Sequence, residues 1–247
     1  MTKKTRLDVA LVDRGLVASR EQAQRAIMAG EVKVGTSVAS KASLLVPADA
    51  ELTIKTAPRF VGRGGLKLES ALDQFGINPA GAIALDIGAS TGGFTDCLLR
   101  RGAVKVYAVD VGHGQLAWKI RDDPRVVVLE RLNARFLSAH DVPEPVNICV
   151  IDVSFISLTL ILPKALELVT PDGMILGLIK PQFELRPADV GHGGVVRDPA
   201  LHEKAKQSIL DFVAREKRFA VVGIVASAIT GMDGNQEFFV CLRKKSV

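Results

Sequence analysis

An apolar run passes into a glycine-rich turn at Leu85-Asp86-Ile87-Gly88-Ala89-Ser90-Thr91-Gly92-Gly93-Phe94. The apolar residues before the turn indicate a buried strand, and the residue spacing after it indicates a helix. Glycine permits a tight turn and lets a ligand approach the backbone at the carboxyl edge of a parallel sheet. The sequence therefore predicts a strand–turn–helix unit that binds a ligand, with a purely structural turn as the alternative.

The alternation of strands and helices continues on both sides of this turn. Strands are predicted at residues 83–87, 105–109, 126–129, 148–153, 174–179, 221–226 and 238–242, with helices at 93–101, 158–169 and 199–217. Val- and Ile-rich runs separated by helices are typical of a parallel sheet that is covered on both faces. We therefore expect an α/β domain with a mostly parallel seven-stranded sheet and helices on both faces.

Polar residues at the strand ends indicate a nucleoside cofactor. Asp110 ends the second predicted strand, where an acid can accept both ribose hydroxyls. The turn reads G-x-S-x-G-G, which lacks the G-x-G-x-x-G order of dinucleotide sites and favours S-adenosylmethionine. Asn133 follows the third strand and could read an adenine edge, although a turn-forming role is the alternative. The candidate cofactor-binding residues are Asp86, Gly88, Ser90, Gly92, Gly93, Phe94, Asp110, Asn133 and Asp152.

Charged residues at two further strand ends indicate a reaction centre. Asp152 ends the fourth predicted strand and Lys180 ends the fifth, so both should face the same crevice. An acid that orients a lysine suits proton transfer, and a purely structural ion pair is the alternative. Lys67 follows the Arg63-Gly64-Gly65 turn, and Glu237 follows the glycine-containing segment 230–236. Taken singly, these two could be ordinary surface residues.

Composition narrows the class of protein. The chain has 247 residues, of which 48% are apolar and 24% charged, as in a globular protein of one or two domains. No apolar run approaches the ~20 residues that a membrane span needs, and the N-terminus lacks the apolar core of a signal peptide. The three cysteines Cys97, Cys149 and Cys241 are far apart in apolar surroundings, which predicts reduced thiols. We expect a cytoplasmic protein without a metal.

Positive charge is concentrated at the N-terminal end. Residues 1–67 contain 12 Lys and Arg against 6 Asp and Glu, whereas residues 68–247 contain 20 against 21. Such a basic segment is typical of a polyanion-binding module, with a solvated basic face as the alternative. Helical spacing from Leu7 and a capping box at Ser19 and Gln22 predict two helices. The candidate RNA-binding residues are Arg6, Arg14, Arg20, Arg25, Lys33 and Arg63.

The run R-L-D-V-A-L-V-D-R-G-L-V-A-S-R-E-Q-A-Q-R-A-I-M-A-G-E-V-K-V-G at residues 6–35 resembles a known RNA-binding domain. The domain is named after small-subunit ribosomal protein four, and the resemblance covers about residues 5–55. In that family, two helices present basic residues to structured RNA. We therefore divide the chain into a small α+β RNA-binding domain at 1–58, a linker at 59–63 and a second domain at 64–247.

The chain from Phe60 onward resembles the FtsJ-like ribose methyltransferases, which place a Lys-Asp-Lys-Glu tetrad on a Rossmann-like sheet. Several sequence blocks, together with the basic N-terminal segment, make the whole chain similar to the TlyA (haemolysin A) family. These blocks are G-R-G-G-L-K-L at 62–68, D-I-G-A-S-T-G-G-F-T at 86–95, V-D-V-G-H-G-Q-L-A-W at 109–118, D-V-S-F-I-S-L at 152–158, I-K-P-Q-F-E at 179–184 and G-N-Q-E-F-F at 234–239.

The resemblance implies a class I methyltransferase that uses S-adenosylmethionine to methylate the 2′-hydroxyl of cytidine in 23S or 16S ribosomal RNA. It assigns catalysis to Lys67, Asp152, Lys180 and Glu237. Expected partners are ribosomal RNA or ribosomal subunits, with no membrane or metal, and the protein would be a monomer or weak dimer. A membrane-active haemolysin and a non-catalytic ribosome-binding factor are the alternatives.

Two departures from the family pattern leave the ribosomal subunit open. Phe60 stands where a tryptophan-containing element is expected. The sequence also stops at Val247, soon after Glu237, whereas longer relatives carry a further tail. Shorter relatives are implied to modify only large-subunit RNA.

Overall fold

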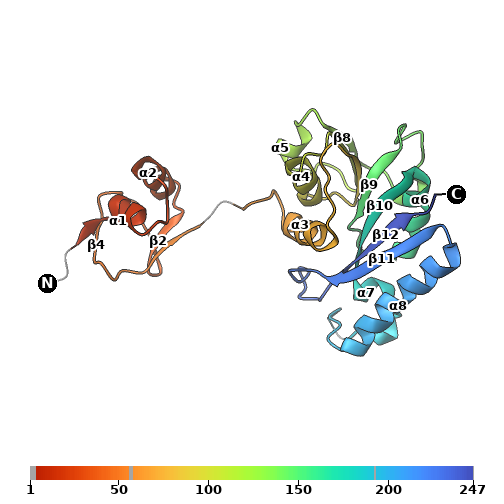
Figure 1. Cartoon of the computed structure of the whole chain (residues 1–247). Helices are drawn as coiled ribbons and strands as arrows, with labels where there is room; N and C mark the ends of the chain where they lie inside the picture. Colours follow the sequence, from red (N-terminus) through yellow and green to blue (C-terminus); the bar gives the residue numbers. More distant parts are fainter. Residues whose placement is uncertain (1–3, 56–57, 192, 247) are drawn as a thin grey trace. The chain divides into compact units, whose positions relative to one another are not determined.

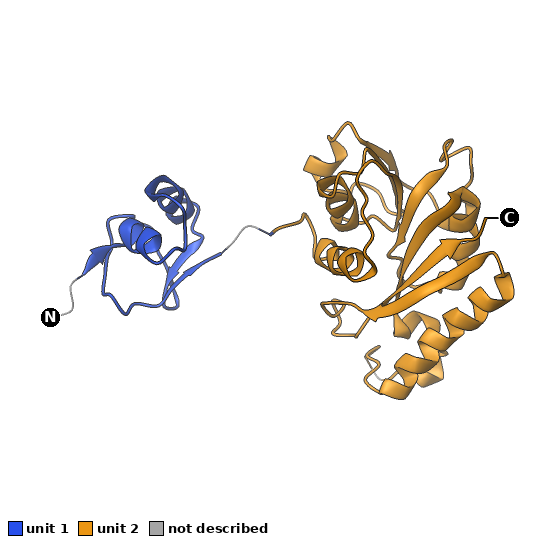
Figure 2. Ribbon diagram, in the orientation of Figure 1, with its two compact units in different colours: residues 1–58 blue, residues 59–247 orange. Residues whose placement is uncertain are grey.

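The chain forms two compact units, residues 1–58 and 59–247 (Figure 2). The computed structural model describes residues 4–55, 58–191 and 193–246. Residues 59–63, which the sequence marks as a linker, pack onto the second unit. Phe60 is buried there, and the backbone N–H of Val61 donates a hydrogen bond to Asp96 at 3.0 Å. This segment therefore contributes to the core of the second unit.

The first unit consists of two helices and short strands. Helices α1 (Leu7–Asp13) and α2 (Arg20–Met28) pack against a small core, and the hydroxyl of Ser19 caps α2 by accepting from the backbone N–H of Gln22. Strand β1 pairs with β4, and β2 lies between β3 and β5. Their bounds are Thr5–Arg6, Val32–Val34, Ser37–Val38, Leu45–Val46 and Leu52–Ile54 for β1 to β5.

A buried carboxylate holds this unit together. Asp8 is inaccessible to solvent and accepts hydrogen bonds from Arg6 at 3.0 and 3.1 Å and from Arg20 at 2.9 Å. The amide of Gln24 donates a further bond at 3.2 Å. The Arg6 guanidinium, against the cost of burial, holds the pKa of Asp8 well below its usual range, and Arg20 and Gln24 add to this effect. Asp8 therefore joins the first strand and α1 to α2.

Replacing Asp8 by alanine should destabilise the first unit. The change removes five hydrogen bonds, one of them from the backbone N–H of Val9, but both arginines stay hydrated, so we expect a loss of about 1–3 kcal/mol. Amide hydrogen exchange of α1 and α2 in the full chain measures it. Asp13→Ala, which removes an exposed acid from the same helix, is the control and should leave exchange unchanged. Equal protection in both variants would contradict this role.

The second unit is built on a seven-stranded sheet (Figure 1). The strand order is β11-β12-β10-β9-β6-β7-β8; β12 pairs antiparallel with β11 and β10, and the other neighbouring strands are parallel. The bounds are Ile83–Ile87, Lys105–Val109, Val126–Leu129, Val146–Ile151, Val169–Ile179, Phe219–Ala226 and Phe238–Lys244 for β6 to β12. The predicted seven-stranded, mostly parallel sheet is confirmed.

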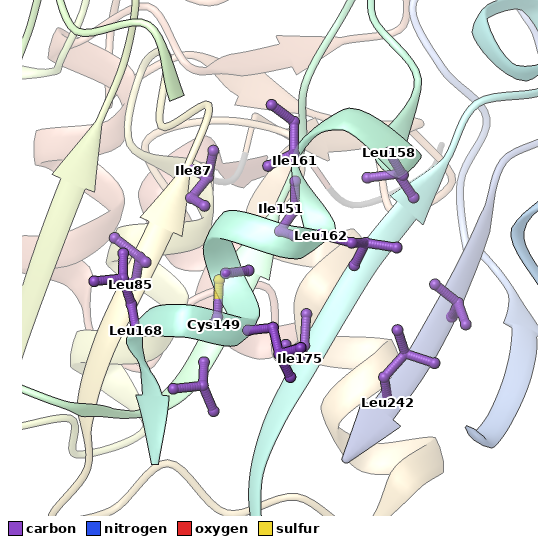
Figure 3. Close-up of a cluster of buried hydrophobic side chains, with 14 of the residues drawn as sticks. Leu85, Ile87, Cys149, Ile151, Leu158, Ile161, Leu162, Leu168, Ile175 and Leu242 are labelled. Carbon is purple, nitrogen blue, oxygen red and sulfur yellow. The ribbon is translucent and has the colours of Figure 1, made fainter. Parts of the chain in front are cut away.

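Helices cover both faces of this sheet because neighbouring strand residues point to opposite sides. Ala84 and Val150 face α3, α4 and α5, whereas Leu85 and Ile151 face α6 and α8. Figure 3 shows the hydrophobic cluster on the α6 and α8 side of the sheet, in which side chains of α6 meet those of β6, β9 and β10. The helix bounds are Gly64–Phe75, Gly93–Arg100, Trp118–Arg121, Leu162–Leu168, Pro181–Glu184 and Pro199–Glu216 for α3 to α8.

The predicted helix at 158–169 is the main departure from the expected elements. A short 3₁₀ helix, η2 (Leu158–Leu160), precedes α6, which has Pro163 in its first turn. Proline lacks a backbone N–H and is tolerated only at the start of a helix, so the segment divides there. Two further 3₁₀ helices are η1 (Ala134–Phe136) and η3 (Pro187–Asp189). Among the described residues, no helix is both long and apolar enough to cross a membrane.

Candidate active site

A cavity of about 790 Å³ opens at the carboxyl edge of the sheet. Its walls come from the glycine-rich turn after β6, the start of α3 and the ends of β9 and β10. The loop between β11 and β12 completes it with residues such as Met232 and Asp233. This volume lies within the range of small-molecule sites, and the edge is where open α/β sheets bind ligands.

One wall carries a lysine between an acid and a hydroxyl. Lys180 Nζ lies 2.6 Å from Asp152 Oδ1 and donates a hydrogen bond to Ser154 Oγ at 2.9 Å. β9 and β10 are neighbouring parallel strands, so the residues that follow them meet. Asp152 Oδ1 is buried, and its contact with the lysine is a charge contact without hydrogen-bond geometry. The expected meeting of Asp152 and Lys180 thus occurs.

A second ion pair lies in the same cavity. Lys67 Nζ on α3 donates to Glu237 Oε2 at 2.5 Å, and the two side chains are 10% and 3% exposed. They are 170 positions apart in the sequence. Gly231 makes room for this pair, because a Cβ at that position would lie 2.6 Å from Glu237 Oε1. Lys67 and Glu237 are therefore buried partners rather than surface residues.

The structure gathers most of the candidate catalytic and cofactor-binding residues around this cavity. The predicted residues that line it are Arg63, Lys67, Gly88, Ser90, Gly93, Phe94, Asp152, Lys180 and Glu237. The cavity lining does not include Asp86, Gly92, Asp110 or Asn133. These four lie around the glycine-rich turn or on neighbouring loops.

Asp110 and Asn133 have structural partners. The carboxylate of Asp110 accepts hydrogen bonds from the backbone N–H groups of Ser90 and Gly112, both at 2.7 Å, and so holds the glycine-rich turn. Asn133 Oδ1 accepts from the N–H of Arg135 at 3.0 Å and caps η1. The turn-forming alternative for Asn133 is therefore the arrangement observed here.

Asp86 is a buried acid beneath the turn. Thr95 donates a hydrogen bond to its Oδ2 at 2.6 Å, while its Oδ1 is buried without a partner. Burial raises the pKa of Asp86 to about 7, and the charges of Asp152 and Asp110 add to the rise. Asp110, and Asp86 where it is ionised, thus add negative potential beside the turn, whereas the charge of Asp152 is paired with Lys180. That arrangement suits a cationic ligand such as a sulfonium compound.

The raised pKa of Asp86 makes stability depend on pH. Its favourable contribution to folding is complete below the usual carboxyl pKa and is lost as the pH rises through about 7. Asp86→Asn does not titrate and retains an acceptor for Thr95. We therefore compare the difference in unfolding temperature, variant minus natural protein, at two pH values. This difference should be more positive at pH 8 than at pH 5. Calorimetry measures this, and an equal difference at both pH values would contradict it.

Several cavity residues were not singled out from the sequence. Phe155 is 91% exposed at the cavity mouth, and its φ of +64° is unusual for a bulky residue. Its ring packs on Phe183, with 5.1 Å between centroids. Ser154 and Met232 also line the cavity. The positions of Ser154 and Phe155, two and three residues after Asp152, were a signal that could have identified them.

The six candidate RNA-binding residues fall into three groups. Arg6 and Arg20 bind Asp8, and Arg14 donates to the backbone carbonyls of residues 47, 48 and 50, so these three support the first unit. Arg25 and Lys33 are exposed on α2 and β2. In the second unit, Arg63 at the start of α3 lines the cavity and donates to the carbonyl of Thr230 at 2.9 Å.

Comparison with known families agrees with this geometry. Residues 60–244 match the FtsJ-like methyltransferase family, and residues 5–52 match the S4 domain. The chain belongs to the FtsJ-like methyltransferase family. Its S4 domain and full-length relatives also place it with TlyA, so the resemblance drawn from the sequence blocks is confirmed. The protein is a methyltransferase with an appended S4 domain.

Relatives of this FtsJ-like methyltransferase are similar along the whole chain. The "16S/23S rRNA (cytidine-2'-O)-methyltransferase TlyA" of Mycobacterium tuberculosis is 45% identical over 100% of this chain and 92% of its own. "Hemolysin A" of Brachyspira hyodysenteriae is 43% identical over 94% of this chain and 97% of its own. A solved structure, "Putative hemolysin from Streptococcus thermophilus", has a TM-score of 0.74 and 42% identity, covering 100% of this chain and 90% of its own.

Proposed function

We propose that this methyltransferase uses S-adenosylmethionine to methylate the 2′-hydroxyl of a cytidine in 23S or 16S ribosomal RNA. The observation that carries the proposal is the convergence of two lysine–acid pairs on one cavity beside the glycine-rich turn. The name of the Mycobacterium tuberculosis relative states the same reaction for that protein. Such a substrate would place the protein in the cytoplasm.

The proposed cofactor site is the side of the cavity that the glycine-rich turn forms. Gly88, Ser90, Gly93 and Phe94 line it, and Asp152 closes it toward Lys180. The carboxylates of Asp86 and Asp110 act from behind the turn, through negative potential and by holding its backbone. When bound, S-adenosylmethionine supplies a methyl group on a sulfonium sulfur. After the methyl group is transferred, this sulfur departs as a neutral thioether, which is a good leaving group.

Lys180 is the proposed acceptor of the proton from the 2′-hydroxyl. The step requires Lys180 as the neutral amine: its two N–H groups then face Asp152 and Ser154, and the lone pair of Nζ is left for the ribose hydroxyl. As the bond from the ribose oxygen to the methyl carbon forms, the bond from carbon to sulfur breaks and the hydroxyl proton passes to Lys180 Nζ. Asp152 orients the lysine and balances the added charge.

Lys67 and Glu237 hold the ribose in the proposed mechanism. One offers donors and the other an acceptor, and burial of both side chains fixes their positions. Holding the hydroxyl in line with the methyl group is itself a large contribution, of about 7–11 kcal/mol in well-oriented reactions. The exposed ring of Phe155 at the cavity mouth offers a face on which an extruded base could stack.

Removing Lys180 or Asp152 should abolish most methyl transfer. A general acid–base group contributes about 10²–10⁴-fold, so Lys180→Ala should lose activity on this scale. Residues that act as a unit are not additive, so Asp152→Asn combined with Lys180→Ala should be little worse than Lys180→Ala. Lys67→Ala and Glu237→Ala should retain more activity. Transfer of labelled methyl to separated ribosomal subunits measures the rate, and mapping identifies the modified nucleotide.

Calorimetric titration with S-adenosylhomocysteine is the control for these variants. Lys180→Ala should still bind this product, because the glycine-rich turn is unchanged. Full activity of Lys180→Ala on ribosomal subunits would refute the mechanism. If the natural protein failed to methylate either subunit, the proposed substrate would be wrong.

The S4 domain is proposed to add affinity for ribosomal RNA without taking part in the chemistry. Arg25 and Lys33 are its exposed candidate contacts, whereas Arg6, Arg14 and Arg20 support its fold. Arg25→Ala with Lys33→Ala should therefore weaken RNA binding without unfolding the domain. The dependence of affinity on salt should also decrease, by about 0.7–0.9 in the log–log slope per lost phosphate contact.

Binding titrations at several salt concentrations measure this effect. The control, Lys217→Ala, removes one exposed charge after α8 in the other unit. If the Arg25 and Lys33 double variant bound ribosomal RNA as tightly and with the same salt slope, these two side chains would have no role in RNA binding.

A further inference from the structure

Two loops contribute to the wall of the cavity that carries Glu237. Val190 and Gly194, between α7 and α8, line the cavity together with Met232 and Asp233, between β11 and β12. Glu237 of the buried ion pair ends the second loop, directly before β12. The placement of Glu237 therefore depends on how these loops are held.

The buried side chain of Asn235 joins the two loops. Its Oδ1 accepts a hydrogen bond from the backbone N–H of Val196 at 2.8 Å, and its Nδ2 donates to the carbonyl of Gly194 at 2.9 Å. Segment 194–196 lies outside the helices and strands, so its backbone groups need partners of this kind. Asn235 therefore supplies both an acceptor and a donor to one stretch of the neighbouring loop.

Asn235 also shapes the loop that carries Glu237. Its backbone carbonyl accepts from the N–H of Gly231 at 2.8 Å, and Gly231 is the residue that leaves room for Glu237 Oε1. Two residues after Asn235, the carbonyl of Glu237 accepts from the N–H of Ser227 at 2.9 Å, which extends the pairing of β11 with β12. A displacement of Asn235 would thus be transmitted to Glu237 through a short stretch of backbone.

His202 on α8 makes a second connection to the same segment. Its Nε2 donates to the carbonyl of Val196 at 2.9 Å, and its ring packs against the ring of Phe238, with 5.5 Å between centroids. Phe238 directly follows Glu237. The segment is therefore connected to the chain on both sides of Glu237, by Asn235 before it and by Phe238 after it.

We propose that Asn235 is a positioning residue for methyl transfer, which holds the two loops together and so sets the place of Glu237 against the ribose. The role of Glu237 in this step rests on the proposed function. The cavity lining does not include Asn235, so this residue acts through Glu237 and not on the substrate. An aspartate would not serve, because a carboxylate has no donor for the carbonyl of Gly194 and would add a buried charge.

Hydrogen exchange of the full chain tests the connection without relying on activity. In Asn235→Ala, the amide of Val196 loses its acceptor and should exchange about 5- to 150-fold faster. The amide of Ser227, which reports whether the backbone of Glu237 stays in place, should also exchange faster, while β6 keeps its protection. The control Asn147→Ala removes an amide side chain that accepts the backbone N–H beginning β6 at 2.9 Å. It should leave both reporter amides unchanged.

A double-mutant cycle with Glu237 tests the consequence for the reaction. Asn235→Ala should lower kcat by up to about 10²-fold, the scale of a misplacement of about 1 Å, and by no more than Glu237→Ala does. When Glu237→Ala is already present, the same change should cost little more, because a residue that acts through Glu237 has nothing left to position. The milder His202→Phe, whose ring still packs on Phe238, should give the same pattern with a smaller loss. Binding of S-adenosylhomocysteine should be unchanged.

Three results would overturn the proposal. Faster exchange of Val196 with unchanged protection of Ser227 would mean that the contact does not reach Glu237. An equal loss of activity in the natural and the Glu237→Ala backgrounds would assign Asn235 a general structural role, as would loss of protection throughout β6 in both Asn235→Ala and His202→Phe. If the natural protein did not methylate ribosomal RNA, the proposed function would fail, and the exchange results would still decide whether Asn235 places Glu237.

Discussion

The buried contact between Lys67 and Glu237 joins the first helix of the second unit to the residue that precedes its last strand. Its ammonium and carboxylate are almost fully removed from water, so each needs the other. The contact brings the start of α3 to the carboxyl edge of the sheet, where the antiparallel strand β12 begins. Buried ion pairs are rarely more stabilising than apolar packing of the same volume. Their presence at a cavity wall is therefore better explained by the chemistry that a positioned ammonium and carboxylate can perform.

Close backbone approach makes this arrangement possible. A Cβ at Gly93 would lie 3.0 Å from the backbone nitrogen of Gly65, so the starts of α3 and α4 meet where neither residue has a side chain. A Cβ at Gly88 would lie 2.4 Å from the carbonyl oxygen of Asp152, which brings the turn directly against the end of β9. Asp110 then holds the turn through Ser90. The glycines of the motif thus pack the elements together and leave the cavity open beside them.

Charge has different consequences in the two units. In the S4 domain, Asp8 gathers Arg6 and Arg20, so part of the basic excess stabilises the fold and a smaller part is left for a partner. In the methyltransferase domain, burial and neighbouring carboxylates act on Asp86 together and raise its pKa. Both effects depend on which charged groups are brought close, and a count of charges along the chain cannot distinguish them.

The sequence by itself determined the order and kind of the main elements. Alternating Val- and Ile-rich runs predicted all seven strands of the sheet, because burial on both faces demands near-continuous apolar residues. The ends of neighbouring parallel strands must meet, so the pairing of Asp152 with Lys180 could also be expected. Only the tertiary structure decided that Lys67 meets Glu237, that Asn133 caps η1 and that Phe155 is exposed at the cavity mouth. These outcomes depend on contacts between distant segments and on loop conformations, for which local periodicity carries no information.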